Sequence, residues 1–138
     1  MGNGHLLKDN LLKATAALPN GAANVTTSAI DLGQYTQAAD FVAECELVIT
    51  APALNTAQQP DAKTLTYDVV MSDNADLSSP VTLYGGVGVQ TGTGGAGAAA
   101  ATYRVALPTN VKRYVGVKVT GSGAGNSGTA NVVAELAF

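Results

Sequence analysis

Residues Lys63–Leu83, KTLTYDVVMSDNADLSSPVTL, have the spacing of two β-strands joined by a polar turn. Large apolar side chains take every second position of the first half, at Leu65, Tyr67, Val69 and Met71. Successive strand side chains point to opposite faces, so this alternation gives one apolar and one mostly polar face. Residues 72–80 are rich in Ser, Asp, Asn and Pro, which form turns. The stretch therefore predicts a hairpin with one buried face.

Similar patterns recur on both sides of this hairpin. They predict further strands over residues 24–32, 41–51, 84–90, 98–107, 111–120 and 130–138. The glycines within 84–90 predict a bend or a bulge in that strand. Strands at this spacing without intervening helices are typical of an antiparallel β-sandwich. The sequence therefore predicts an all-β, jelly-roll-like sandwich that forms one domain over residues 22–138.

The N-terminal segment, residues 1–21, has a different pattern. Its leucines could share one stripe of a helix over residues 2–19, which Pro19 and Gly21 would end; they are Leu6, Leu7, Leu11, Leu12 and Leu18. Either this segment is a short helix on the core, or it is an arm that docks on another subunit. Simple disorder is a third possibility. Exposed leucines on an arm need a partner to cover them.

Composition excludes several classes of protein. Charged residues make up 12% of the 138, about half the usual share, and the net charge of −3 gives no reason to bind nucleic acid. No apolar run is long enough to cross a membrane, and charged residues interrupt the N-terminal leucines of any signal peptide. The single cysteine, Cys45, excludes a disulfide framework. We expect the chain in the cytosol, or in a particle assembled there.

Two glycine runs, residues 92–97 and 123–128, fit the pattern G-x-G-x-x-G. A dinucleotide site also needs a helix after the glycines and an acidic residue about 20 positions later. Pro108 would cut short a helix after the first run, and Glu135 is the only acidic residue beyond either run. We interpret both runs as loops and predict no cofactor site.

Reactive side chains are few and poorly placed for catalysis. His5 is the only histidine and lies in the N-terminal segment, while Cys45 alternates with core positions and is expected to be buried and inert. Glu44 and Glu46 share one face of a predicted strand, which is typical of a solvated surface. The sequence therefore predicts no catalytic residues.

The turn 72–80 loosely resembles a calcium loop. Asp73, Asn74 and Asp76 offer oxygen ligands, but their spacing is wrong and no distal glutamate follows. We interpret them as turn residues and predict no metal site.

Several valines fall on the faces that alternation assigns to solvent. Either these faces are covered within the domain, or the valines contact another subunit; the low charge content favours an interface. The candidate interface residues are Leu6, Leu7, Leu11, Leu12, Val42, Val48, Val70 and Val133.

Four blocks of the sequence resemble the small capsid cement, or decoration, proteins of tailed bacteriophages, particularly the Bordetella-phage type. The blocks are SAIDLG at 28–33, LTYDVVMSDNADLSSP at 65–80, RYVGVKVTG at 113–121, and the small-residue loop before the closing ANVVAELAF. Together they span most of residues 28–138.

The resemblance implies a jelly-roll-like fold, no catalysis, self-association as a dimer or trimer, and binding to major capsid proteins on the outside of a virion. It supplies no site residues. The main rival is a carbohydrate- or receptor-binding β-sandwich of a phage fibre or adhesin. That rival predicts an exposed aromatic platform near Tyr35 or Tyr84, whereas an enzyme would need a concave pocket with converging polar groups.

Overall fold

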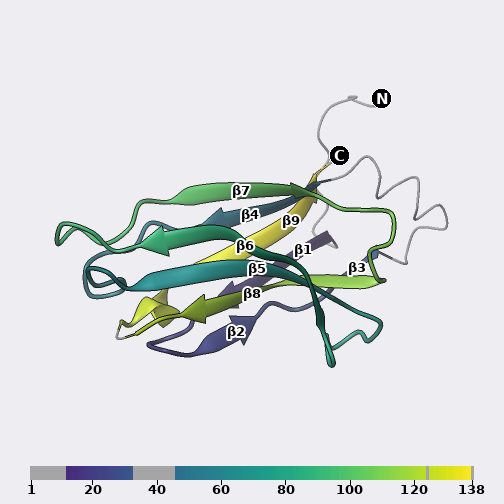
Figure 1. Ribbon diagram of the computed structural model, residues 1–138, viewed down its shortest axis with the longest axis horizontal. Coiled ribbons are helices and arrows are strands. Elements are labelled where there is room, and N and C mark those ends of the chain that lie inside the picture. The colour runs from purple at the N-terminus through teal and green to yellow at the C-terminus, as the bar shows by residue number, and fades with distance from the viewer. Residues whose placement is uncertain (1–11, 33–45, 124, 138) are drawn as a thin grey trace.

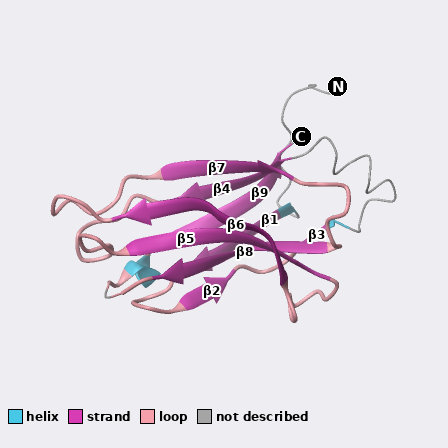
Figure 2. Ribbon diagram, viewed as in Figure 1, coloured by secondary structure: helices cyan, strands magenta, loops and turns pink. Residues whose placement is uncertain are grey.

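The computed structural model describes residues 12–32, 46–123 and 125–137, which are nearly all strand and loop, without an α-helix (Figures 1 and 2). The strands are β1 (Lys13–Ala17), β2 (Asn24–Thr26), β3 (Ile30–Asp31), β4 (Glu46–Ala51), β5 (Thr64–Ser72), β6 (Val81–Thr91), β7 (Ala101–Ala106), β8 (Tyr114–Gly121) and β9 (Asn131–Ala137). A 3-10 turn, η3 (Ser127–Thr129), precedes β9. Within these residues no helix is long and apolar enough to cross a lipid bilayer.

The strands form two antiparallel sheets that pack face to face (Figure 1). Sheet A has the order β1-β9-β4-β7, and sheet B has the order β2-β8-β5-β6, with β3 also paired to β8. The pairs are nested along the sequence: β1 with β9, β2 with β8, β4 with β7, and β5 with β6. Successive pairs alternate between the sheets, which is the topology of a jelly roll. The predicted all-β sandwich is confirmed.

The core lies between the sheets and follows the predicted alternation. Leu65, Tyr67 and Val69 of β5 face it, with Val115, Val117 and Val119 of β8 beside them on the same inner face. Sheet A contributes Leu47 and Ile49 of β4 and Val132, Ala134 and Leu136 of β9. All of these side chains are at most 2% exposed, so the period-two pattern identified them correctly.

The structure corrects the expected helix where it describes that segment. Lys13–Ala17 is a strand that pairs antiparallel with β9, from Lys13 opposite Glu135 to Ala17 opposite Asn131. Leu12 and Leu18, at the two ends of this strand, are buried in the core. A five-residue segment that contains three alanines fits a strand as well as a helix, and pairing with β9 decides the outcome. Residues 12–21 thus belong to the sandwich.

The single strand expected over residues 24–32 is two short strands, β2 and β3. Residues 27–29 separate them, and Thr27 bonds twice to β8. Its backbone N–H donates to the Val117 carbonyl at 2.9 Å, while its hydroxyl accepts from the Val117 N–H at 3.1 Å. The N–H and the carbonyl of Val117 in β8 are therefore both hydrogen-bonded where β2 and β3 are interrupted.

Candidate functional interface

Exposed apolar side chains concentrate on one strand. Among the described residues, the large hydrophobic side chains that are exposed are Val81 at 47%, Tyr84 at 37% and Val89 at 50%, and all three belong to β6. β6 is the last strand of sheet B and pairs on one side only, with β5. It carries no charged residue. An uncharged apolar edge strand is a candidate binding surface, because no strand pairs with its outer edge and its apolar side chains are exposed.

A double irregularity bends β6 at its middle (Figure 1). The register with β5 shifts between Tyr67 and Val69, where Asp68 lies opposite extra residues of β6, and again between Val69 and Val70. Gly86 has a φ of 65°, which glycine adopts without strain, and its N–H donates to Oδ1 of Asp68 at 2.7 Å. The bulge predicted from the glycines is confirmed. It separates β6 into two short arms, one with Val81 and Tyr84 exposed and the other with Val89 exposed.

Two tyrosines close the side of the sandwich between the edge strands β6 and β7. The Tyr84 hydroxyl donates to the Ala106 carbonyl of β7 at 3.1 Å. Tyr103 of β7 reaches back over β6, so close to Gly88 that no side chain could fit there. The Tyr103 ring also lies 5.5 Å from the ring of Tyr67, centroid to centroid, at a tilt of 43°. β6 is therefore held in place by contacts with β7, although no strand pairs with its outer edge.

A buried polar network fixes the end of β6. The Tyr67 hydroxyl donates to Oε1 of Gln90 at 2.6 Å, and Nε2 of Gln90 donates to the carbonyls of Pro52 and Ala99 at 2.8 and 2.9 Å. Burial raises the pKa of the Tyr67 hydroxyl well above its usual value, and the nearby Tyr103 raises it further. The hydroxyl thus stays protonated and continues to donate, which ties β6 to the loops after β4 and β6.

Four of the predicted interface residues lie in the part of the chain that the structure describes, and they differ in how far they are exposed. Val48 and Val70 are only 3% and 2% exposed, and Leu12 lies in the core, so the domain itself covers all three. Val133 is half-buried on the outer face of sheet A, between Thr15 and Thr50. The remaining candidates, Leu6, Leu7, Leu11 and Val42, lie outside the described residues, as do His5, Tyr35, Glu44 and Cys45.

Val48 does face outward from sheet A, but its own domain covers it. Its cross-strand neighbours on that face are Arg104 of β7 and Glu135 of β9. Arg104 forms an ion pair with Glu46 at 3.5 Å, two residues before Val48 on the same face. Long charged side chains bury their aliphatic stems over apolar neighbours, which accounts for the small exposure of Val48.

Val70 is covered by the turn that follows β5. Its neighbour on β8 is Gly116, and Leu77 lies so close to Gly116 that an added Cβ would come within 2.5 Å of the leucine Cδ1. Leu77 is buried, with a φ of 57° that is unusual for a side chain of this kind. The turn therefore folds back over the outer face of sheet B, a contact that alternation along a strand cannot reveal.

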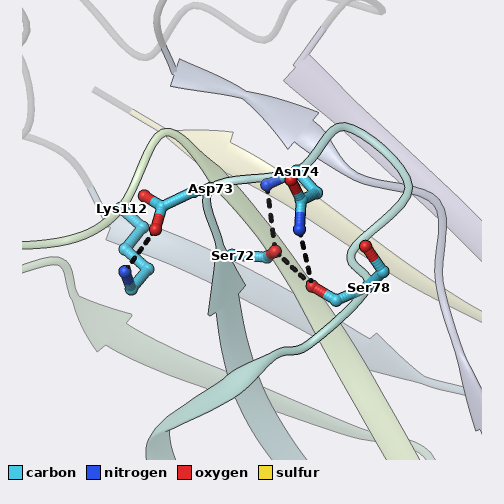
Figure 3. Close-up of polar contacts among 5 residues, drawn as sticks. All are labelled: Ser72, Asp73, Asn74, Ser78 and Lys112. Atoms are coloured by element: carbon cyan, nitrogen blue, oxygen red, sulfur yellow. Dashed lines mark hydrogen bonds and ion pairs between the residues drawn. The ribbon is translucent and has the colours of Figure 1, made fainter.

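The turn itself is held by its own polar groups (Figure 3). The Ser72 hydroxyl donates to the Ser78 carbonyl at 2.6 Å and accepts from the Asn74 N–H at 3.0 Å. Asp73 pairs with Lys112 at 2.6 Å, and Asp76 accepts from the Ser78 N–H at 2.9 Å. Hydrogen bonds from the side chain and then from the backbone of Ser78 lower the pKa of Asp76. Both carboxylates are thus engaged in the turn, and the described residues contain no group of three or more metal-ligating side chains of the kind His, Cys, Asp or Glu.

The first glycine run forms a loop at one end of the sandwich, as predicted, and the described residues of the second run lie in a loop and in η3 at the same end (Figure 1). Several of their glycines are in close contact with neighbouring backbone. Gly97 has a φ of 73° and lies under the Leu54 carbonyl, where no side chain fits. Gly92 is pressed against the carbonyl of Pro60 in the same way, and a Cβ on Gly125 would lie 2.6 Å from the Gln58 carbonyl oxygen. Neither run is followed by an α-helix, so neither has the helix N-terminus that a phosphate site uses.

The surface of β6 was missed from the sequence, although a signal was present. Residues 77–103 form the longest stretch of the chain without a charged residue. Comparison with known proteins adds no assignment: the chain matches no protein-family model, and no curated protein matches it.

Proposed function

We propose that this chain is a structural virion protein that binds the outer surface of a tailed-phage capsid and stabilises it by bridging major capsid protein subunits. The observation that carries the proposal is the concentration of exposed apolar side chains on the uncharged edge strand β6. Such a surface acts by contact with other proteins. The resemblance of four sequence blocks to phage cement proteins supplies the class of particle.

The rest of the molecule supports a role that depends on shape. Loops at one end are packed through glycines, and the turn 73–80 is tied by side-chain hydrogen bonds. Buried polar side chains such as Gln90 and Tyr67 bond to each other and to nearby carbonyls. A preorganised domain loses little conformational freedom on binding, so modest contacts can still contribute to affinity.

The mechanism is additive over the shell. Once one copy is held by a first contact, its other contacts form at high effective concentration. Repeated over a closed symmetric shell, many weak bridges resist the pressure of packaged DNA. Jelly rolls occur in viral capsids and in lectins, so the fold alone is an analogy and the binding surface is the stronger argument.

The experiment compares shells before and after removal of the protein. Shells stripped of the chain should burst at a lower temperature, and adding back the purified chain should restore the original value. A variant with Val89→Lys, which places a charge on β6, should restore less than the matched surface variant Thr102→Lys on β7. Shells whose stability does not change on stripping would contradict the proposal.

The rival carbohydrate-binding function is tested with the same material. Tyr84 is partly exposed, but its hydroxyl is bonded to Ala106 and its ring lies at a strand edge. If the isolated chain bound glycans, and Tyr84→Ala abolished that binding without affecting shell stability, the rival would replace our proposal.

A further inference from the structure

We propose that Asn20 is a site of spontaneous deamidation which the folded domain protects, and that its conversion to isoaspartate unlocks the loop between β1 and β2. The inference goes beyond the proposed function and does not depend on it. It starts from the sequence, in which Asn3 and Asn20 are the asparagines followed directly by glycine. Glycine has no side chain to hinder the approach of its own nitrogen to the preceding asparagine.

The reaction needs only water and a trace of hydroxide, which removes the proton of the Gly21 N–H. The nitrogen attacks Cγ of Asn20, so that the N–Cγ bond forms, the Cγ–Nδ2 bond breaks, and ammonia leaves after taking a proton from water. Water then opens the succinimide ring. Cleavage of the N–Cγ bond gives aspartate, whereas cleavage between the nitrogen and the backbone carbonyl carbon gives isoaspartate, whose main chain runs through Cβ and Cγ.

The folded domain holds the attacking nitrogen. The Gly21 N–H donates to the Gly125 carbonyl at 3.1 Å, so this hydrogen bond must break before the nitrogen can lose its proton. Gly21 has a φ of 63°, and its carbonyl oxygen lies so close to Gly121 that an added Cβ there would be 2.3 Å from it. The backbone of Gly21 is therefore fixed by two segments that are distant in the sequence.

The carbon that would be attacked is held as well. Oδ1 of Asn20 accepts a hydrogen bond from the Gly128 N–H at 2.8 Å, and an added Cβ on Gly128 would lie 3.1 Å from Cγ of Asn20. Just before it, the Pro19 carbonyl accepts a hydrogen bond from the buried Ser127 hydroxyl. Ring closure competes with these contacts, so we expect it to occur in molecules in which this end of the sandwich has opened locally.

The product decides whether this end can close again. The loop with Asn20 joins β1 of sheet A to β2 of sheet B, and its contacts with residues 125–128 connect it to the segment before β9. Aspartate leaves the main chain unchanged and keeps an acceptor oxygen for the Gly128 N–H. Isoaspartate adds a carbon atom to the main chain before Gly21, which displaces its N–H from the Gly125 carbonyl. Isoaspartate therefore loosens the junction, and aspartate does not.

The test incubates the full wild-type chain at mildly alkaline pH in oxygen-18 water, both folded and in denaturing urea, and maps its peptides by mass spectrometry. Ring opening incorporates an oxygen atom from water, so the label marks newly formed product. In urea, Asn3 and Asn20 should convert at similar rates, because only the sequence then matters. In the folded chain, Asn20 should convert at least about tenfold more slowly than in urea. Equal rates at Asn20 in the two states, or no conversion in urea, would overturn the inference.

Ser127→Ala tests whether the local contacts provide the protection. It removes the hydroxyl that binds the Pro19 carbonyl and leaves the reacting residues unchanged, so Asn20 in the folded chain should convert about fivefold faster. Ser72→Ala is the matched control, because Ser72 is also buried and also donates to a carbonyl, but lies opposite Tyr114 at the other end of β8. It should leave the rate unchanged. Equal acceleration by both variants would show that Asn20 reacts from the globally unfolded chain, and would overturn the local lock.

The stability of the products gives a second reading. The isoaspartate form, separated by chromatography, should unfold at a lower urea concentration than the unmodified chain. Asn20→Asp should unfold at about the same concentration as the wild type, because its main chain is unchanged. An isoaspartate form as stable as the wild type would overturn the proposed unlocking. None of these measurements involves shells, so their outcome is separate from that of the proposed function.

Discussion

The two ends of the sandwich are held together by different kinds of contact. At one end, the loops after β1, β4, β6 and β8 meet through backbone groups: Gly21 N–H donates to the Gly125 carbonyl, Asn126 N–H to that of Ala57, and Leu54 and Ala98 form an isolated bridge. At the other end, charged side chains join the segments. Arg113 binds Asp31 through two hydrogen bonds of 2.8 and 3.1 Å, and Lys112 binds Asp73 at 2.6 Å.

The difference gives a packing reason for the glycine-rich runs. Where backbones touch, a side chain would separate the loops, so glycine is required by packing. Where side chains make the contact, ordinary residues suffice. β6 runs from the charged end to the glycine-packed end, and both ends therefore fix the strand that we propose as the interface.

The largest effect is expected from Gly97→Ala. The added methyl group would collide with the Leu54 carbonyl, and the residue would keep a positive φ. Overpacking and the left-handed conformation together should cost about 3 kcal/mol or more of unfolding free energy in urea titrations.

Gly94→Ala is the matched control, since Gly94 has a similar φ of 60° but open space around it. Only the conformational cost, about 1–2 kcal/mol, should remain. Equal losses for both variants would show that close packing of this end is not what the glycines provide.

A smaller effect is expected from Tyr67→Phe, which leaves Oε1 of Gln90 buried without the hydroxyl that donates to it. The loss should be about 1–2 kcal/mol in the same titration. Tyr84→Phe, which removes an exposed hydrogen bond, should lose less. A larger loss for Tyr84→Phe would contradict the role given to the buried network.

The Tyr67 hydroxyl also predicts how the free energy of unfolding changes at high pH. Because burial raises the pKa of Tyr67 in the folded state, the unfolded chain releases this proton first as the pH rises above about 10. Stability should be unaffected by this group at neutral pH. Above about pH 10 it should fall by up to about 1.4 kcal/mol per pH unit. In Tyr67→Phe this slope should be shallower, although the raised pKa of Tyr103 leaves a residual dependence.

The smallest effect is expected at the charged end. Lys112→Ala removes an ion pair whose aspartate is largely exposed, so the loss should be about 0–1 kcal/mol and should shrink with added salt. A salt-independent loss as large as that of Gly97→Ala would remove the distinction between the two ends.

The sequence was sufficient for what depends on local spacing. Alternation in Lys63–Ser72 identified the buried face of β5, and the glycines near Gly86 predicted the bulge. It was insufficient where distant segments decide the outcome. Lys13–Ala17 is a strand because β9 offers it an edge, and Val70 is buried because Leu77 folds over Gly116.

Only part of the candidate interface on β6 could be predicted from the sequence. The strand that forms it was predicted, and so was its break at the glycines. Its place at the edge of sheet B follows from the pairing order of the strands, which no local pattern contains. Val48 and Val133 drew attention because valines beside charged residues look like an interface, whereas Val48 is buried within the chain beside the ion pair of Arg104 and Glu46.

The most direct test of the proposed function is to titrate purified chain onto preassembled, expanded shells of a tailed phage, and to measure the bound amount by co-sedimentation. Binding should saturate at a fixed ratio to the major capsid protein, and Val89→Lys should weaken it while Thr102→Lys should not. A folded chain that binds no shell at any concentration would contradict the account.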